Sequence, residues 1–577
     1  MFRSNYLDYA ALMEQLGTWA QQHPEFVRLS VLGKSAEGRD IPLLTLGCNP
    51  DTLRPAVWVD GNMHASEVCG CSVALAIAED IISLHLGQAS GGAKTLPPHM
   101  AQALTGTLFY IVPRMSPDGA EAILKTGRYV RSSMQNTRVN KGHAFWQAQD
   151  INGDGMAGYM RQQDSNGDLI ELRDEHNVPL DPPVMTARMP EDAGPFYKMY
   201  PEGVIANFDG RRIPDPYFLS DNQYDFNRNF PYSWAPEQEQ AGAGDFPGSA
   251  PETRAVMEFA TTHPNIFTWL NLHTFGGVLI RPLGDKPDSK MDPTDRAIFE
   301  QVEAWMTEHT GYATVSGFHE FLYEPDKPLH GDLSDYAYHQ RGALSYVVEL
   351  WDLFTQLGIE RKKPFIDHYQ KFERKDVFAL ARFDREHNAS RIFKRWQKVP
   401  HPQLGEVEVN GYDPRIGISN PPLERLAHTC ETQSAAFLRV AALTPNLVVE
   451  VVSQEKVDAR LTRVEVRVAN TGYLGSYGLA SAKAMPHTEP LRMTSVGAGV
   501  KVIAPQQAVI EIGHLDGWGA GKYGGTSIFM PWTRGNAHER FVTLVVEGTG
   551  TLLVKVGSCR MGDREITIRL AAEGYAK

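Results

Sequence analysis

Short apolar runs alternate with longer amphipathic segments through the first 445 residues of the chain. Runs with the length and the β-branched, aliphatic and aromatic content of buried strands occur at 56–59, 106–113, 266–272 and 345–351. Residues 68–86, directly after the first run and its loop, have the length and apolar content of a helix. Strands that alternate with helices are typical of α/β domains, so we predict a mixed twisted sheet with helices on both faces.

The segment between about residues 135 and 223 breaks this pattern. It is rich in glycine, proline, aspartate and asparagine and shows little periodicity. Long segments of this kind are uncommon inside compact domains and often have a function. We therefore predict a loop-rich insertion within a catalytic domain that spans residues 1–445.

The pattern changes again from about residue 446. Short alternating segments, separated by turns rich in glycine and asparagine, occur at 447–451, 461–468 and 541–546. Alternation with a period of two is typical of strands that bury one face. We predict that residues 446–577 form a separate all-β sandwich domain.

Composition limits the classes of function. The 577 residues are 42% hydrophobic and 22% charged, which is usual for globular domains. A net charge of -13 disfavours a nucleic-acid-binding face. No uninterrupted apolar stretch has the length of a membrane-spanning helix, the first residues lack the apolar core of a secretory signal, and the five cysteines are scattered. We expect a cytoplasmic protein with neither a nucleic acid nor a membrane as partner.

A histidine and a glutamate lie three residues apart just after the strand at 56–59. These residues, His64 and Glu67, lie in a loop that would bring them to the edge of the sheet. The same spacing at His428 and Glu431 lies in a polar helical stretch with no strand before it, so a solvated helix face explains that pair better. His273 follows the strand at 266–272; it is either a core histidine or the third ligand of a zinc site with one open position.

Four further stretches accompany these three residues in a fixed order. In sequence they are PRMSPDG at 113–119, RYVR at 128–131, DFNRNF at 225–230 and VVEL at 347–350. Together with the three candidate ligands, they resemble the signature of the carboxypeptidase A-type zinc carboxypeptidases. The resemblance covers roughly residues 5–440 apart from the insertion, and it does not extend to the C-terminal domain.

The resemblance implies a role for each matching catalytic position. His64, Glu67 and His273 correspond to the ligands of one Zn²⁺ per chain, a His₂Glu set for which carboxypeptidase A is a standard example. Arg131 corresponds to the arginine that holds the scissile carbonyl oxygen, and Glu349 to the general base.

The resemblance also implies substrate-binding residues. Asn227 and Arg228 correspond to the clamp for the terminal carboxylate, and Asp225 to a partner of a zinc histidine. A tyrosine that folds over the substrate corresponds best to Tyr323, although the spacing needs an adjustment; Tyr338 is the second choice. The sequence does not choose between basic, acidic and apolar C-terminal residues.

The chemistry of peptide hydrolysis requires these residue types. Zinc lowers the pKa of its bound water to about 7, and a carboxylate such as Glu349 takes the proton and returns it to the leaving amine. Arg131 keeps its charge and can stabilise an oxyanion. The guanidinium of Arg228 matches a carboxylate bidentately, which explains cleavage at chain ends. The alternatives are an internal ion pair of Glu349 with Arg228 and a turn role for Asn227.

The insertion contains a second candidate metal site. Residues 150–155, DINGDG, have oxygen side chains at alternate positions followed by glycine, like the first half of a calcium loop. The twelfth position is Arg161 instead of glutamate, but a second acidic cluster at 164–168 could add oxygens. The sequence allows either a Ca²⁺ site or a cluster of polar turns.

Three functions remain open at this point. The first is a zinc-dependent metallocarboxypeptidase that hydrolyses the C-terminal bond of peptides with a free carboxylate. The second is a related zinc amidase or deacylase that acts on small N-acyl or cell-wall peptides. The third is a catalytically silent binding protein on the same scaffold. Asn227 and Arg228 favour the first function over the second, and Glu349 favours the first two over the third.

Overall fold

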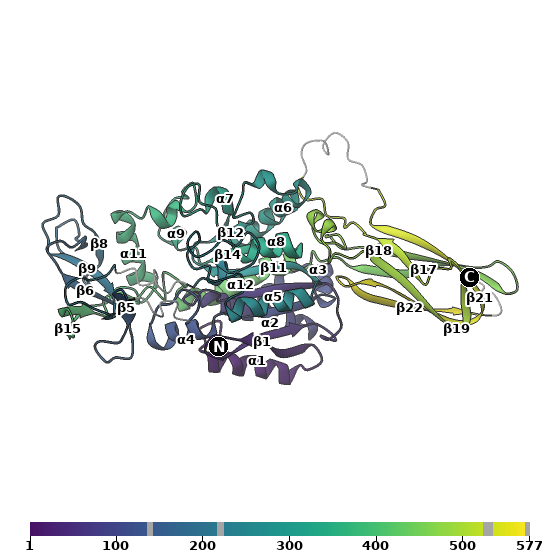
Figure 1. Cartoon of the computed structure of the whole chain (residues 1–577), viewed down its shortest axis with the longest axis horizontal. Helices are drawn as coiled ribbons and strands as arrows, with labels where there is room; N and C mark the ends of the chain where they lie inside the picture. The colour runs from purple at the N-terminus through teal and green to yellow at the C-terminus, as the bar shows by residue number, and fades with distance from the viewer. Residues whose placement is uncertain (135–141, 216–223, 523–534, 572–577) are drawn as a thin grey trace.

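A mixed sheet lies at the centre of the molecule (Figure 1). The computed structural model describes residues 1–134, 142–215, 224–522 and 535–571. In these residues the sheet has eight strands in the order β1-β2-β4-β3-β11-β14-β12-β13. Their bounds are β1 Val27–Lys34, β2 Asp40–Leu46, β3 Ala56–Gly61, β4 Leu108–Val112, β11 Ile266–Thr274, β12 Val278–Arg281, β13 Ala313–Ser316 and β14 Leu344–Leu350. Strands β4, β3, β11 and β14 are parallel neighbours, and each coincides with one of the predicted apolar runs.

Helices cover both faces of this sheet because successive strand residues point to opposite sides. In β3, Val57 and Val59 pack into the core under α2 (Cys69–His85), α6 (Pro293–Thr310) and α12 (Leu423–Ala441). Trp58 packs on the other side, under α5 (Pro251–Thr262) and α8 (Leu333–Arg341). The predicted α/β architecture is confirmed. The remaining helices are α1 Tyr9–Gln22, α3 Pro98–Thr105, α4 Pro117–Thr126, α7 Gly317–Glu320, α9 Leu353–Gln356, α10 Asp367–Gln370 and α11 Arg374–His387.

The insertion forms a β lobe at one end of the molecule, in which short strands alternate with longer loops (Figure 1). Its strands are β5 Phe145–Ala148, β6 Tyr159–Gln163, β7 Leu169–Glu171, β8 Met185–Ala187, β9 Phe196–Pro201 and β10 Gly203–Ala206. Strands β6 to β9 join β15 (Gln397–His401) and β16 (Gly405–Val409) in one sheet, while β5 pairs with β10. Strands this short show no clear period, and one of their partners, β16, comes from a distant part of the chain.

The C-terminal region is all β, as predicted. Its strands are β17 Leu447–Lys456, β18 Leu461–Asn470, β19 Leu491–Ala504, β20 Val509–Gly513, β21 Glu539–Ser558 and β22 Gly562–Leu570. They form a single antiparallel sheet in which the long β21 pairs with β18 through its first half and with β22 through its second. Contacts between β17 and β22 bring the two parts of the sheet together. The predicted domain boundary falls between α12 and β17.

None of the described helices combines the length and the apolar character that a bilayer crossing requires. The expected cytoplasmic location stays a prediction from the sequence.

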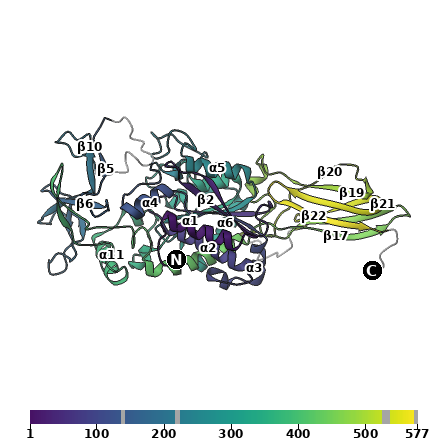
Figure 2. The ribbon, with the colours of Figure 1, turned by 90° about the horizontal axis from the view of Figure 1, so that it is seen from below.

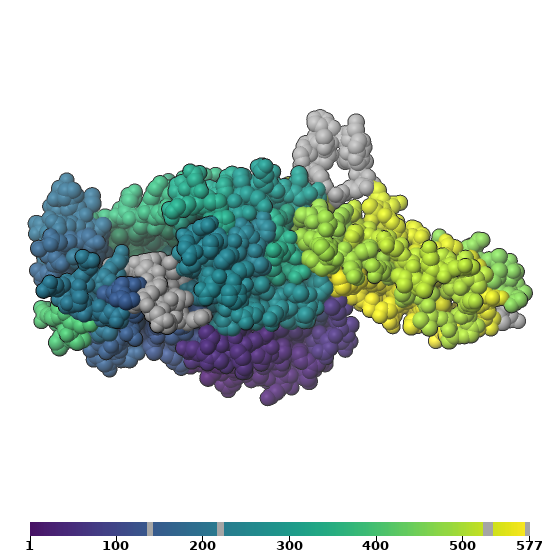
Figure 3. Space-filling model, in the orientation of Figure 1, coloured from purple at the N-terminus to yellow at the C-terminus, as the bar shows by residue number. Residues whose placement is uncertain are grey.

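Arg560 fixes the C-terminal domain to the central sheet. Its side chain is fully buried, with Nη1 donating to the carbonyl of Tyr477 (2.8 Å) and Nη2 to the carbonyl of Ile266 at the start of β11 (3.1 Å). The guanidinium lies 4.6 Å from the centre of the Phe267 ring. Figures 2 and 3 show that the β lobe and the C-terminal domain lie at opposite ends of the central domain. Arg560 therefore makes one charge-assisted hydrogen bond on each side of the interface. One goes to Tyr477 in the C-terminal domain, and the other goes to Ile266 in the central sheet, 294 positions away in sequence.

Replacing Arg560 by alanine is expected to destabilise the protein by about 3 kcal/mol, because the change leaves a cavity and two buried carbonyls without donors. Calorimetry should show a thermal midpoint lower by roughly 2–3 °C, because the unfolding entropy of a chain this long is large. Arg540→Ala, on an exposed position of β21, serves as the control and should change stability by less than about 0.5 kcal/mol. Equal midpoints for the two variants would refute the structural role of Arg560.

Candidate active site

The carboxyl ends of three neighbouring strands carry the candidate ligands and the candidate base. His64 and Glu67 lie in the loop that joins β3 to α2, and His273 lies near the end of β11. Strand β14 is parallel to β11, and Glu349 is the register partner of His273. This edge of a parallel sheet is where α/β proteins gather their functional groups.

Two glycines allow the ligand loop to lie close to the sheet. A Cβ atom on Gly61 would lie 2.6 Å from the carbonyl of Gly70, and one on Gly70 would lie 2.9 Å from the carbonyl oxygen of Leu272. Asn62 has a φ of 56°, a left-handed conformation that asparagine tolerates, and its amide donates to the carbonyl of His64 (2.8 Å). The first turn of α2 is thereby held against β3 and β11, with the ligand side chains directed toward His273.

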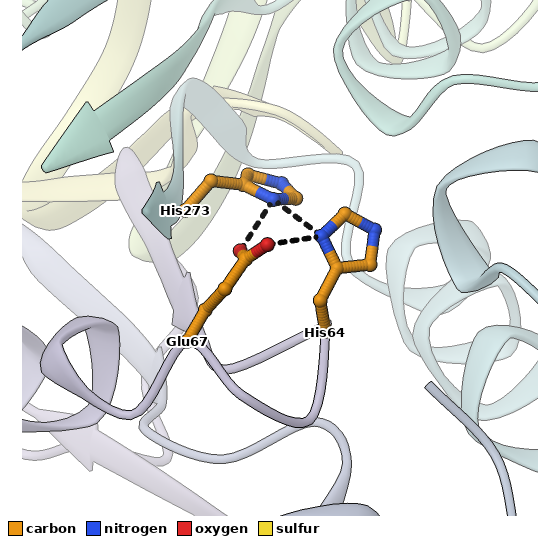
Figure 4. A group of neighbouring side chains, drawn as sticks. All are labelled: His64, Glu67 and His273. Atoms are coloured by element: carbon orange, nitrogen blue, oxygen red, sulfur yellow. Dashed lines mark hydrogen bonds and ion pairs between the residues drawn. The ribbon is translucent and has the colours of Figure 1, made fainter. Parts of the chain in front are cut away.

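The three candidate ligands meet at one point (Figure 4). Nδ1 of His273 is 3.1 Å from Nδ1 of His64 and 3.0 Å from Oε2 of Glu67. Nδ1 of His64 is 2.8 Å from Oε1 of Glu67. Among the residues that the structure describes, this is the one group of three or more histidine, cysteine or acidic side chains whose ligand atoms all lie within 4.8 Å of one another.

The hydrogen-bond partners of Nε2 in His64 and His273 bear on whether Nδ1 of each ring can bind a metal. Nε2 of His64 faces Oδ1 of Asp225 (3.0 Å), and Nε2 of His273 faces Oδ1 of Asn271 (2.5 Å). Both partners are acceptors, so a neutral ring that binds a cation through Nδ1 keeps its proton on Nε2. The lone pairs of both Nδ1 atoms and the carboxylate of Glu67 then converge on one point, which is an arrangement that a cation satisfies.

This donor set fits zinc. Two imidazole nitrogens and one carboxylate leave a fourth position open in a tetrahedral site. Burial raises the pKa of Glu67, but the positive charge that His64 and His273 carry when protonated lowers it by more, so the carboxylate is ionised even without a metal. The hydrogen bonds to the outer nitrogens fix the orientation of both rings.

The other predicted site residues surround the same centre. One pocket is lined by His273 and by all of the predicted catalytic and substrate-binding side chains, namely Arg131, Asn227, Arg228, Tyr323 and Glu349. These residues come from four separate parts of the chain. The structure thus brings together every residue that the sequence placed in the site.

Arg131 and Asp225 form a buried network beside the ligands. Nε of Arg131 donates to Oδ2 of Asp225 (2.9 Å), and its Nη1 lies 3.8 Å from Oε1 of Glu67. Burial raises the pKa of Asp225, but Arg131 and His64 lower it well below its usual range. Asp225 is therefore a permanent anion that orients His64, as the resemblance implied, and also holds Arg131.

Glu349 is half-buried in the pocket. Burial and the nearby charge of Glu67 raise its pKa to about 8, whereas His273 and Arg131 oppose this shift. A carboxyl group in such surroundings exchanges protons near neutral pH, which suits general acid–base chemistry.

Asn227 and Arg228 have different parts in the pocket. Nδ2 of Asn227 donates to Oδ2 of Asp332 (2.7 Å), and its Oδ1 accepts from the backbone N–H of Leu333 (2.9 Å). The side chain of Asn227 is thus fixed against the start of α8, and the second N–H of its amide can still donate to a substrate carboxylate, so the predicted contact stays a prediction. Arg228 donates through Nη1 to the carbonyl of Asn227 (2.6 Å), and within the described residues its Nε and Nη2 form no hydrogen bond. Arg228 is the free cation of the predicted clamp.

The two candidate tyrosines differ in position. Tyr323 lies in the loop after α7, is 47% exposed and lines the pocket, with its ring 6.2 Å from that of Phe321. Tyr338 is buried, and its hydroxyl donates to Asp295 (3.0 Å). The geometry therefore favours Tyr323, the first choice from the sequence.

The structure gives no support to the predicted calcium site. The carboxylate of Asp150 accepts from the backbone N–H groups of Gly153 and Gly155 (both 2.7 Å), and Asp164 accepts from that of Asn166 (2.7 Å). Arg161, at the twelfth position, pairs with Glu408 instead. These acidic groups stabilise turns, which was the alternative interpretation.

Sequence reasoning missed three residues that shape the site: Asp60, Asn271 and Asp332. Asn271 lies two positions before His273 in a strand, so both side chains point to the same side. That spacing was a usable signal for Asn271. Asp60 lies four residues before His64, but its partner Asn271 is far away in sequence, as is Asn227, the partner of Asp332, so spacing does not reveal either contact.

Comparison with known proteins agrees with this geometry. A family model described as "Zinc carboxypeptidase" matches residues 12–168 and 216–361, and a domain of unknown function matches residues 446–569. A zinc carboxypeptidase of Saccharothrix mutabilis subsp. capreolus is 33% identical over 144 residues, which are 24% of this chain and 31% of that protein. An inactive metallocarboxypeptidase, ECM14, of Ajellomyces dermatitidis (strain ER-3 / ATCC MYA-2586) is 31% identical over 139 residues, 23% of this chain and 22% of that protein.

The chain therefore spans less than a third of the length of either of these relatives. Among solved structures, carboxypeptidase A from Helicoverpa armigera aligns with a TM-score of 0.40 and 17% identity, over 66% of this chain and 74% of that one. The family model itself covers more than half of the chain. Because both of its matched segments contain candidate ligands or pocket residues, the ligand set and the family assignment support each other: the chain belongs to the zinc carboxypeptidase family.

Proposed function

We propose that the protein is a zinc-dependent metallocarboxypeptidase that removes the C-terminal residue of peptides. One observation carries this proposal. The convergent His64, Glu67 and His273 site shares a pocket with an acid–base carboxyl group, Glu349, and with a free guanidinium, Arg228. A hydrolytic centre and a receptor for a terminal carboxylate are the two parts that an exopeptidase needs.

The residues of the pocket have separate roles in the proposed hydrolysis. When bound, zinc supplies Lewis acidity, which lowers the pKa of water to about 7 in such sites. Glu349 accepts the proton of the attacking water and delivers it to the leaving amine. Arg131, held by Asp225, donates to the oxygen on which negative charge develops. A divalent cation nearby favours the ionised form of Glu349, as a general base requires.

Arg228 binds the terminal carboxylate of the substrate. Its Nε and Nη2 can donate to the two carboxylate oxygens as a planar fork. The bond from Nη1 to the carbonyl of Asn227 fixes the guanidinium, and the contacts of Asn227 with Asp332 and Leu333 fix that carbonyl in turn. Asn227 therefore positions Arg228, and Tyr323 covers the bound substrate from the rim of the pocket.

The C-terminal side chain that fits this pocket is apolar. Beyond the clamp, the lining includes Ile280, Phe321, Leu329 and Val347. Arg281 and Asp332 also border the pocket, but both are engaged within the protein. The guanidinium of Arg281 pairs with buried Asp288 and Glu303, and the carboxylate of Asp332 accepts from Asn227 and from the first backbone N–H groups of α8. An apolar substrate side chain gains burial here, whereas a charged one would lose its hydration without a partner.

Two other functions remain as alternatives. A zinc amidase or deacylase acting on small N-acyl or cell-wall peptides would use the same metal and base, but it has no need for Arg228. A catalytically silent binding protein has a precedent in the relative that is named inactive. Retention of all three ligands and of Glu349 favours an active enzyme.

A panel of peptides that differ in the last residue and in its carboxyl group tests the proposal. We expect peptides with a free C-terminus and an apolar last residue to be cleaved, and their C-terminal amides to be cleaved at least about 100-fold more slowly. A chelator should abolish activity, and one equivalent of Zn²⁺ should restore it. Equal cleavage of amides would favour the amidase, and no cleavage by the zinc-loaded protein would favour the silent binding protein.

A further inference from the structure

We propose that Asp60, acting through Asn271, holds the ring proton of His273 on Nε2 and thereby sets the zinc affinity of the site. This inference rests on the proposed zinc site but not on peptidase activity. It assigns a positioning role to a carboxylate that does not touch the metal ligands.

Asp60 lies at the end of β3 and is completely buried. Its Oδ2 accepts from the indole N–H groups of Trp58 (2.7 Å) and Trp269 (3.0 Å), and its Oδ1 accepts from Nδ2 of Asn271. Within the described residues, the Asp60 carboxylate has three neutral donors and no cationic partner. A buried carboxylate without a countercharge is costly unless a nearby positive charge compensates for it.

This environment allows one orientation of the Asn271 amide. The NH₂ group must face the carboxylate, because the opposite orientation would place the amide oxygen against Oδ1 of Asp60. The amide oxygen then faces Nε2 of His273 at 2.5 Å. Nε2 must be the protonated nitrogen, and Nδ1 presents its lone pair to the metal position.

The two histidine ligands are thus oriented by carboxylates in different ways. His64 contacts Asp225 directly, and Asp225 is also paired with Arg131. His273 is connected to Asp60 through the polarisable amide of Asn271, and this carboxylate has no arginine to neutralise it. Asp60 therefore also contributes an uncompensated negative charge that favours a cation at the site.

Replacing Asp60 by asparagine is expected to reverse the direction of two hydrogen bonds, the one between position 60 and Asn271 and the one between Asn271 and His273. The new amide oxygen still accepts from the two indoles, but its NH₂ group faces the NH₂ group of Asn271. Rotation of the Asn271 amide by half a turn removes that clash and places its NH₂ group against Nε2 of His273. The imidazole proton then moves to Nδ1, where it occupies the lone pair that binds the metal.

Nitrogen-15 NMR of histidine-labelled, metal-free protein tests the proton position directly. Spectra are recorded across pH to observe neutral rings, and the signals of His273 are assigned with His273→Gln. We expect protonation at Nε2 in the wild type and at Nδ1 in Asp60→Asn. Competition with a chromophoric chelator should show zinc binding that is about 10–100-fold weaker in this variant.

Trp58→Phe is the matched control, because it removes one donor to Asp60 without changing the direction of the hydrogen bonds to His273. It should leave the proton on Nε2 and change zinc affinity by less than about threefold. Asn271→Leu, which removes the acceptor for Nε2–H, provides a second test if Asp60→Asn folds poorly. It should give a mixture of tautomers and weaker zinc binding.

Protonation at Nδ1 in the wild type, or wild-type tautomer and zinc affinity in the correctly folded variants, would overturn the proposal. A wild type that binds zinc as described but cleaves no peptide would contradict the proposed peptidase function alone. The two proposals therefore fail in distinguishable ways.

Discussion

Glu349→Gln should lower kcat/KM for a cleaved peptide by about 10²–10⁴-fold while the protein keeps one zinc ion per chain. Glutamine has nearly the same shape but cannot accept the proton of the attacking water. Because Glu349 lies on β14 and is not one of the three convergent ligands, metal binding should remain. Steady-state kinetics and metal analysis of the same preparation measure both quantities.

Glu360→Gln is the matched control, since this glutamate is exposed and lies outside the pocket. It should retain wild-type kinetics. Activity of Glu349→Gln within tenfold of the wild type would exclude Glu349 as the base. Loss of zinc together with activity would show instead that Glu349 helps to hold the metal.

Arg228→Ala should weaken cleavage of free-carboxylate peptides by about 10²-fold, equivalent to roughly 3 kcal/mol. The change removes the cation whose Nε and Nη2 are free to bind the substrate terminus. Cleavage of the corresponding amides, which do not use this contact, should change little. The ratio of kcat/KM values for acid and amide substrates therefore measures the clamp itself.

Arg228→Lys retains the charge without the planar fork and should fall between the wild type and Arg228→Ala. Arg296→Ala, on the exposed side of α6, is the control and should preserve the acid-to-amide ratio. An unchanged ratio in Arg228→Ala would contradict the role of Arg228 and support an amidase or deacylase.

Much of the central fold and of the metal centre can be predicted from sequence because the signals are local. Apolar runs such as 56–59 and 266–272 have the length of buried strands, and parallel strands bring their carboxyl ends to the same edge. A histidine or glutamate just after such a run must therefore lie near the others. This geometry explains why His64, Glu67 and His273 could be proposed as one site before their distances were known, whereas Glu349 was identified through the resemblance to the family signature.

The sequence alone determined the architecture of the central domain, the all-β character of the C-terminal region and the set of residues around the metal centre. Tertiary structure decided which hydrogen bonds those residues form. One N–H of the Asn227 amide donates to Asp332, a partner that no motif indicated, and Asp60, which the sequence did not single out, accepts from Asn271. The strands of the insertion pair mainly with one another, and β16, from a distant part of the chain, extends their sheet by pairing with β6. Periodicity and motif spacing reflect interactions between residues that are close in sequence. The partner of a buried polar group or of a short strand lies in a distant segment, and only folding brings the two together.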